Sequence, residues 1–221
     1  MIRAVVYDVD GTLLDTIDTI AGYANAALEK FGLPTQPTEK YKYFVGNGAK
    51  KLVERMIDAS GVPQSEYYDK VYEYYNKLYD SSPIGVTKPF DGIPELISDV
   101  NKLGIRQAVL SNKPDYATCQ VVTHFFPSEF YKVYGGREGI KLKPDPDALL
   151  SILRELQVSP SECLYVGDTY VDMLTGKSAG AFTVGVLWGF RDRAELEEYH
   201  ADRIVKKPSE IFAIINELNE A

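Results

Sequence analysis

The 221-residue chain has little cysteine, histidine or tryptophan: it contains two cysteines, two histidines and one tryptophan. Cys119 and Cys163 lie far apart in mainly apolar or helical surroundings. We expect them to be reduced thiols of a cytoplasmic protein, with a disulfide as the alternative. We identify neither a signal peptide nor an apolar run long enough to span a bilayer.

The chain also lacks blocks of one charge. Its 24 Lys and Arg residues and 32 Asp and Glu residues give a net charge of −8, spread along the sequence. Without a basic patch or a basic amphipathic helix, the sequence favours neither nucleic acid nor a membrane surface as a partner. A hydrophobic content of 45% suffices for a full core. The length suits one domain, or a core domain with a smaller insertion.

Two aspartates follow the first apolar segment. Residues 4–7 lead directly into Asp8 and Asp10, and then into Gly11. A short continuous apolar run predicts a buried parallel strand, and residues i and i+2 leave such a strand on the same side. Two carboxylates placed together in this way require a cation, a shared proton or several donors. The structural alternative is a single aspartate that caps the next turn.

A helical block follows the first strand. Apolar residues at helical spacing predict three helices, over residues 17–31, 48–61 and 65–79. No strand pattern occurs between residues 16 and 82. The block therefore separates the first strand from the rest of the chain.

The last helix of this block is rich in tyrosine. One of its stripes consists of Tyr68, Tyr72, Tyr75 and Tyr79. Such a stripe is typical of the packed face of a helical bundle. The alternative is that these rings line a substrate pocket or stack on a base.

From residue 89 onward, strand and helix patterns alternate. We predict strands at 105–110, 131–134, 163–166, 182–187 and 203–205, and helices at 94–103, 115–125, 146–156, 171–179, 195–199 and 209–218. This alternation predicts an α/β fold, a Rossmann-like parallel sheet with helices on both faces. The core would comprise residues 1–16 and 83–221, and the inserted all-helical part residues 17–82.

Polar side chains follow four of the predicted strands, where the carboxyl ends of parallel strands meet. They are Asp8 and Asp10, then Ser111 and Asn112, then Lys143, and finally Asp168 and Asp172. This set carries excess negative charge, and hard oxygen ligands of this kind favour Mg²⁺. A Mg²⁺ ion between carboxylate and phosphate, with lysine and serine on the remaining phosphate oxygens, suits phosphoryl transfer.

These motifs resemble a known family over the whole chain. Asp-Val-Asp-Gly-Thr at 8–12, Leu-Ser-Asn at 110–112, Lys-Pro at 143–144, and Gly-Asp at 167–168 with Asp172 are similar to the four motifs of haloacid dehalogenase-like (HAD) phosphohydrolases. Three further segments resemble the phosphoglycolate phosphatase branch, at 89–93, 111–114 and 185–190. The helical block is similar to the helical cap of that branch (the C1 type).

The resemblance implies a role for each catalytic motif residue. Asp8 would be the nucleophile that forms an aspartyl phosphate, and Asp10 would be the general acid and base. Ser111 would hold a phosphoryl oxygen, and Asn112 would support the site. Lys143 would neutralise charge on Asp8 and on the phosphoryl group; its structural alternative is a surface lysine before a turn.

The same resemblance implies a Mg²⁺ site. Asp8, the main-chain carbonyl of Asp10, and Asp168 would bind the ion. Asp172, one helical turn after Asp168, would ligate the metal or orient a water bound to it. A carboxylate that interacts with the start of its helix is an equal alternative for Asp172.

Substrate contacts are expected from Lys113 and from the helical block. Asn47, Gly48 and Lys51 lie where glycines, a helix start and lysines come together, which suits an anion. The alternative for these residues is a flexible loop with solvated lysines. The alternative for Lys113 is a solvated lysine before Pro114. Arg191 is a further candidate at the edge of the site.

The resemblance therefore implies a Mg²⁺-dependent phosphatase, a monomer or homodimer, that hydrolyses a small soluble phosphomonoester such as phosphoglycolate. A sugar-phosphate mutase would share the core motifs, but similar mutases carry Arg where this chain has Ala49. A non-catalytic regulatory protein that binds a phosphate ligand is the alternative of a different class. Such proteins usually lose the nucleophile or a metal ligand, and here all are present.

Overall fold

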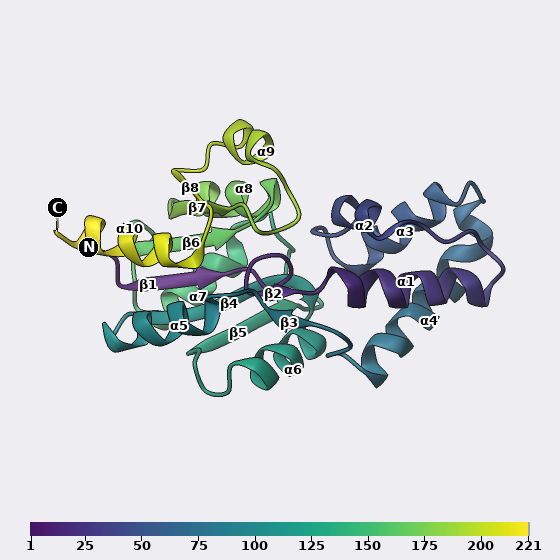
Figure 1. Cartoon of the computed structure of the whole chain (residues 1–221), viewed down its shortest axis with the longest axis horizontal. Helices are drawn as coiled ribbons and strands as arrows, with labels where there is room; N and C mark the ends of the chain where they lie inside the picture. Colours follow the sequence, from purple (N-terminus) through teal and green to yellow (C-terminus); the bar gives the residue numbers. More distant parts are fainter. Residues whose placement is uncertain (221) are drawn as a thin grey trace.

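A six-stranded parallel sheet forms the centre of the protein. The computed structural model describes residues 1–220, and the sheet has the order β5-β4-β1-β6-β7-β8 (Figure 1). The strands are β1 (Ala4–Tyr7), β4 (Arg106–Pro114), β5 (Lys132–Gly136), β6 (Cys163–Gly167), β7 (Phe182–Val186) and β8 (Arg203–Val205). Strands β4 and β5 lie on one side of β1, and the later strands β6, β7 and β8 lie on the other side. The carboxyl end of β1 is thus the switch point at which open α/β sheets bind ligands.

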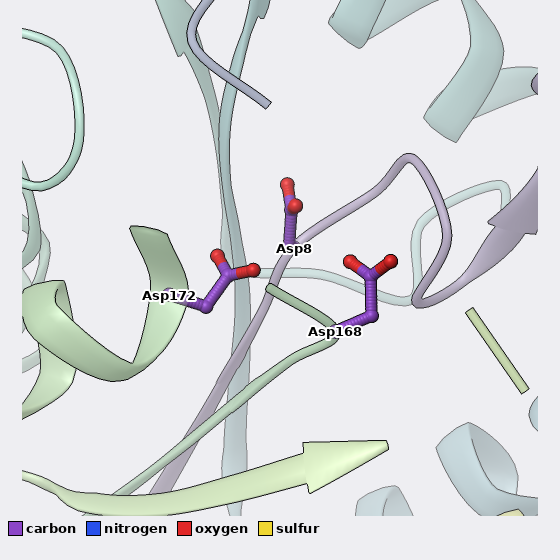
Figure 2. Close-up of side chains that lie close together, drawn as sticks. All are labelled: Asp8, Asp168 and Asp172. Carbon is purple, nitrogen blue, oxygen red and sulfur yellow. The ribbon is translucent and has the colours of Figure 1, made fainter. Parts of the chain in front are cut away.

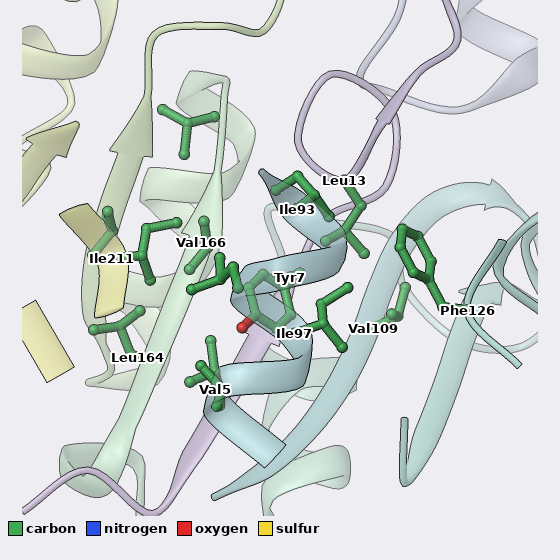
Figure 3. Close-up of a cluster of buried hydrophobic side chains, with 14 of the residues drawn as sticks. Val5, Tyr7, Leu13, Ile93, Ile97, Val109, Phe126, Leu164, Val166 and Ile211 are labelled. Atoms are coloured by element: carbon green, nitrogen blue, oxygen red, sulfur yellow. The ribbon is translucent and has the colours of Figure 1, made fainter. Parts of the chain in front are cut away.

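Helices cover both faces of this sheet. Val5 and Tyr7 of β1 pack on one face and Ala4 and Val6 on the other, so the strand is apolar throughout. Figure 3 shows Val5 and Tyr7 beside Ile97 on the first face. The helices are α5 (Ile93–Lys102), α6 (Asp115–Phe125) and α10 (Pro208–Glu220) on this face, and α7 (Asp147–Leu156) and α8 (Tyr170–Ala179) on the opposite face. The predicted α/β fold is confirmed.

Four helices form a second apolar cluster at one end of the molecule (Figure 1). They are α1 (Ile17–Lys30), α2 (Thr38–Phe44), α3 (Ala49–Ala59) and α4 (Gln64–Ser81). Two short antiparallel strands, β2 (Leu14–Asp15) and β3 (Lys88–Pro89), lie where the chain enters and leaves this block. The three helices predicted here are present.

The sequence patterns did not reveal α2, β2 or β3. Helix α2 has seven residues, of which Tyr41 alone is buried, so it has no apolar period to detect. Strands β2 and β3 have two residues each, which is too short for an alternating pattern.

In the core, the alternating elements lie close to their predicted positions. The main difference is β4, which continues beyond the predicted residue 110 as far as Pro114. Residues 111–113 are therefore buried inside a strand, where the β4–β5 register shifts. The remaining elements are α9 (Arg193–Glu198) and a short 3-10 turn, η1 (Pro160–Glu162).

Cys119 and Cys163 are free thiols, as predicted. Burial raises the pKa of the Cys163 thiol above its usual range. Within residues 1–220, no helix combines the length and hydrophobicity needed to cross a membrane.

Candidate active site

Three buried carboxylates meet at the carboxyl edge of the sheet. Asp8 directly follows β1, Asp168 directly follows β6, and Asp172 lies in the first turn of α8. Each offers an oxygen within 4.8 Å of the oxygens of the other two. Figure 2 shows the Asp8 and Asp168 side chains next to each other, with Asp172 directed towards Asp8. Parallel strands bring residues that are distant in sequence to one edge, as predicted.

Lys143 supplies positive charge to this cluster. Its Nζ lies 2.9 Å from Oδ1 of Asp8 and 2.7 Å from Oδ1 of Asp172, and its side chain is 2% exposed. The surface alternative for Lys143 is thereby excluded. Asn112 holds the lysine's backbone, because its side chain donates to the Lys143 carbonyl and accepts from the Lys143 amide, at 2.9 and 2.8 Å.

The charges in this cluster do not balance. Burial raises the pKa of Asp8 to about 7, with Lys143 opposing that rise and Asp172 and Asp10 adding to it. Burial, Asp172 and Asp8 raise the pKa of Asp168 well above its usual range. Although burial opposes it, the pull of Asp172 and Asp8 raises the pKa of Lys143. Three carboxylates around one ammonium leave excess negative charge, and this oxygen donor set fits a divalent cation.

Asp168 is held from two sides. Its Oδ1 accepts from the Thr12 hydroxyl at 3.3 Å, and its Oδ2 accepts from the Phe190 amide at 2.7 Å. Gly11 has φ +83°, and a Cβ there would lie 2.3 Å from Oδ2 of Asp168. Only glycine allows this backbone angle and this close approach together.

Asp172 interacts with the start of its own helix, which is the structural alternative that the sequence left open. Its Oδ2 accepts from the Thr169 amide at 3.2 Å and from the Thr169 hydroxyl at 3.1 Å, in a capping box at the start of α8. Its Oδ1 accepts from Lys143. A role of Asp172 as a direct metal ligand remains a prediction.

Asp10 faces a cavity between the sheet edge and the helical block. The cavity measures about 50 Å³ and is lined on the core side by Asp8, Asp10, Ser111, Asn112, Lys113, Pro114, Thr169 and Phe190. The helical block contributes Ile20, Val45, Gly46, Gly48, Ala49, Leu52 and Tyr75. Asp8, Asp10 and Ser111, which the motifs predicted to be catalytic, thus line the same cavity.

Lys113 joins Asp10 to the helical block. Its Nζ lies 3.1 and 3.4 Å from the two carboxylate oxygens of Asp10, and it donates to the Tyr79 hydroxyl at 3.0 Å. The lysine side chain is 5% exposed. The solvated alternative for Lys113 is therefore excluded.

The predicted substrate-binding residues of the helical block differ in their position relative to the cavity. Gly48 lines the cavity. Asn47 instead exchanges hydrogen bonds with the Tyr170 hydroxyl at 3.2 and 3.3 Å, and accepts from Arg55 at 2.8 Å. Lys51 is exposed, pairs with Glu54 and lies outside the cavity lining, so its placement does not support the predicted substrate contact.

Several polar contacts join the helical block to the core. The Asn112 side chain donates to the Gly46 carbonyl at 2.9 Å. The Arg191 guanidinium lies 4.9 Å from the centre of the Tyr43 ring and donates to the Lys42 carbonyl. Of these residues, Arg191 was predicted at the site edge. Tyr170 carries no sequence signal for its contact, because its partner Asn47 is 123 positions away.

Comparison with known proteins identifies relatives of this chain. The family model of haloacid dehalogenase-like hydrolases matches residues 5–186. The phosphoglycolate phosphatase of Vibrio parahaemolyticus is 28% identical over 219 residues, which cover 97% of this chain and 96% of that protein.

Solved structures share the fold. A predicted phosphoglycolate phosphatase from Haemophilus somnus has a TM-score of 0.91 at 23% identity, with 96% of this chain and 97% of that chain covered. A β-phosphoglucomutase from Clostridium difficile has a TM-score of 0.77 at 21% identity, with 100% of both chains covered. The fold is thus common to phosphatases and mutases and does not by itself distinguish them.

Proposed function

The chain belongs to the haloacid dehalogenase-like hydrolases, and we propose that it is a Mg²⁺-dependent phosphatase that acts on small phosphomonoesters such as phosphoglycolate. The observation that carries this proposal is the shared cavity of Asp8 and Asp10, with Lys143 in contact with Asp8. A nucleophile, a second carboxyl group and a fixed positive charge are the groups that two-step ester hydrolysis requires.

In the first step, a carboxylate oxygen of Asp8 attacks phosphorus and the bond from phosphorus to the ester oxygen breaks. Asp10 gives its proton to the departing oxygen, so the leaving group is released as an alcohol. Lys143 remains paired with Asp8 and keeps that carboxylate ionised and oriented. Ser111, which lines the same cavity, hydrogen-bonds to a phosphoryl oxygen.

In the second step, water attacks the phosphorus atom of the aspartyl phosphate. Asp10, now ionised, takes a proton from that water, and the bond between phosphorus and the Asp8 oxygen breaks. Inorganic phosphate leaves, and both aspartates return to their starting protonation states. One difficult hydrolysis is thereby divided into two easier substitutions.

Asp8, Asp168 and Asp172, together with the main-chain carbonyl of Asp10, would hold Mg²⁺. When bound, the ion offsets the negative charge of the phosphoryl group and of the carboxylates. The buried carboxylates and their raised pKa values support a cation at this position.

We propose that residues 17–82 form a cap domain over a core of residues 1–16 and 83–221. A cavity of about 50 Å³ suits a short ester, since one water needs roughly 10–15 Å³ of the same kind of space. The first amides of α3, next to Gly48, lack helical partners and suit an anionic group on the substrate. Such a small soluble ester is consistent with a cytoplasmic enzyme.

The test is phosphate release from a panel of phosphate esters, with and without Mg²⁺. We expect release only with Mg²⁺, with the highest kcat/KM for phosphoglycolate among esters of similar length. The Asp8→Asn variant is the control and should be inactive on every ester. If the wild-type protein with Mg²⁺ released no phosphate from any ester, the proposal would be wrong.

A further inference from the structure

Tyr75, on α4, differs from the other buried tyrosines in the hydrogen bonding of its hydroxyl. The hydroxyls of the other four all have hydrogen-bond partners: Tyr7 contacts Gln107, Tyr41 contacts Asn25, Tyr79 contacts Lys113 and Tyr165 contacts Asp172. Tyr75 is 4% exposed, and no group within residues 1–220 forms a hydrogen bond with its hydroxyl. Because burying a polar group without a partner costs free energy, such a hydroxyl needs a functional explanation.

The position of Tyr75 supplies that explanation. Its side chain lines the proposed active-site cavity together with Asp10 and Lys113. The Tyr75 hydroxyl is not among the fully enclosed polar atoms of residues 1–220 that lack a partner. Part of its surface is therefore accessible from the cavities that Tyr75 lines, and Lys113 lines each of them as well. Burial raises the pKa of Tyr75 well above its usual range. The hydroxyl is therefore protonated at neutral pH and available as a donor.

The charge next to Tyr75 indicates what the hydroxyl contacts. Among the residues that line this cavity in the described part of the chain, Lys113 is the sole cationic side chain. An ammonium has three N–H donors. Two N–H donors of Lys113 are directed to Asp10 and to the Tyr79 hydroxyl, which leaves one donor for a further acceptor.

The other cap-side walls of the cavity offer no competing polar side chain. Ile20, Val45 and Leu52 are apolar, and Gly46, Gly48 and Ala49 contribute no polar side-chain atoms. On this side of the cavity, a polar group on the leaving part of a substrate would therefore find its side-chain donor at Tyr75, with the positive charge of Lys113 opposite on the core side.

We propose that Tyr75 determines specificity by donating a hydrogen bond to a carboxylate on the leaving group of the ester, while Lys113 supplies the positive charge. The proposal rests on the proposed phosphatase function and adds a recognition residue to it. Tyr75 takes part in no bond-making step, so its effect depends on the substrate.

The test compares Tyr75→Phe with wild type on phosphoglycolate and on ethyl phosphate, which lacks the carboxylate. A hydrogen bond to a charged group predicts a fall of about 10-fold to 100-fold in kcat/KM for phosphoglycolate. For ethyl phosphate we expect a change of less than about threefold, since no such bond is lost. An equal fall for both esters, or no fall for either, would overturn the role of Tyr75.

Tyr72→Phe is the matched control on the same helix. Tyr72 stacks on Tyr68 and lies outside the lining of the active-site cavity, so both esters should behave as with wild type. Stability supplies an independent measurement: Tyr75→Phe should unfold at the same temperature as wild type or higher. Tyr41→Phe should unfold at a lower temperature, because it loses a hydrogen bond to Asn25.

A binding measurement separates this inference from the proposed function. Calorimetric titration of phosphoglycolate into Asp8→Asn and into Asp8→Asn with Tyr75→Phe requires no turnover. We expect the second variant to bind about 10-fold to 100-fold more weakly. Equal affinity would overturn the role of Tyr75 even if the wild type is an active phosphatase. Absence of turnover in wild type, with the affinity difference retained, would instead overturn the proposed function alone.

Discussion

The Nζ atom of Lys143 lies 2.9 Å from Oδ1 of Asp8, and both side chains are almost completely buried. Removing one partner of a buried ion pair leaves the other charge uncompensated, at a cost of about 3–5 kcal/mol. We therefore expect Lys143→Met to lower the free energy of unfolding by about 3 kcal/mol and to abolish activity. Urea unfolding of the metal-free proteins measures the first effect.

Lys141→Met is the control for this prediction. Lys141 lies two residues earlier in the same loop, is 70% exposed, and pairs with Asp145. Its replacement should change stability by no more than about 0.5 kcal/mol. Equal stability of the two variants would contradict a stabilising role for the Lys143 pair.

The stability of the metal-free protein should fall as pH rises from about 4 to about 7. The pKa of Asp8 rises from 3.8 to about 7 in the folded state, so the folded protein binds this proton more tightly than the unfolded chain. The contribution of Asp8 is fully present below the unfolded pKa and is lost as pH rises through the folded pKa. Thermal unfolding in chelator at a series of pH values measures this loss.

Asp8→Asn should weaken this pH dependence. At pH 8 in chelator we expect the variant to be more stable than wild type by at least about 1 kcal/mol, since its amide cannot ionise and Lys143 keeps its ion pair with Asp172. At pH 4 the two proteins should differ little. A parallel pH dependence in both would show that Asp8 is not the group responsible.

Metal binding should be measurable without turnover. Mg²⁺ at 100 times its dissociation constant should stabilise wild type by about 2.7 kcal/mol, and Asp168→Asn by much less. Activity should disappear with chelator and return with Mg²⁺, whereas Ca²⁺ should inhibit because it takes more and longer oxygen contacts. Full turnover in chelator would exclude this mechanism.

Asp10→Asn should affect alkyl and aryl esters differently. The variant keeps the shape of the side chain but loses the proton donor, and general acid catalysis is worth about 10²–10⁴-fold. An alkoxide needs that proton, whereas p-nitrophenolate leaves without it. In a single turnover, release of p-nitrophenol should remain rapid and release of an alkyl alcohol should become slow. The same loss for both esters would assign Asp10 a structural role.

Steady-state rates should hide this difference, because in the proposed mechanism Asp10 would also serve as the base for the shared aspartyl phosphate. With p-nitrophenyl phosphate we therefore expect a rapid burst followed by slow turnover. Asp8→Asn provides the control, since it should show no burst with either ester.

Strand patterns were sufficient to predict where the proposed motif residues meet. Asp8 and Asp168 each follow a short apolar run, and parallel strands with such runs end at one edge of a sheet. The sequence could not predict that β4 continues through Ser111 and Asn112, because polar residues rarely belong to a buried strand. That extension is stabilised by long-range contacts such as the Asn112 bonds to the Lys143 backbone.

The position of the helical block relative to the core depended on tertiary structure. Helical spacing predicted α3 but not which of its sides faces the cavity, so it did not separate Ala49, which lines the cavity, from the exposed Lys51. In the same way, the tyrosine stripe on α4 predicted a packed face without distinguishing Tyr79, whose hydroxyl accepts from Lys113, from Tyr75.

The sequence by itself determined the α/β fold and the set of oxygen and nitrogen donors at the sheet edge, because both follow from local hydrophobic period and strand order. The tertiary structure alone decided that Lys113 contacts Asp10 and that Tyr75 reaches the cavity. Lys113 and Asp10 are 103 positions apart in the sequence, and Tyr75 belongs to the apolar cluster of the helical block, which packs separately from that of the sheet. The relative placement of two such clusters depends on their whole surfaces, and no local pattern records it.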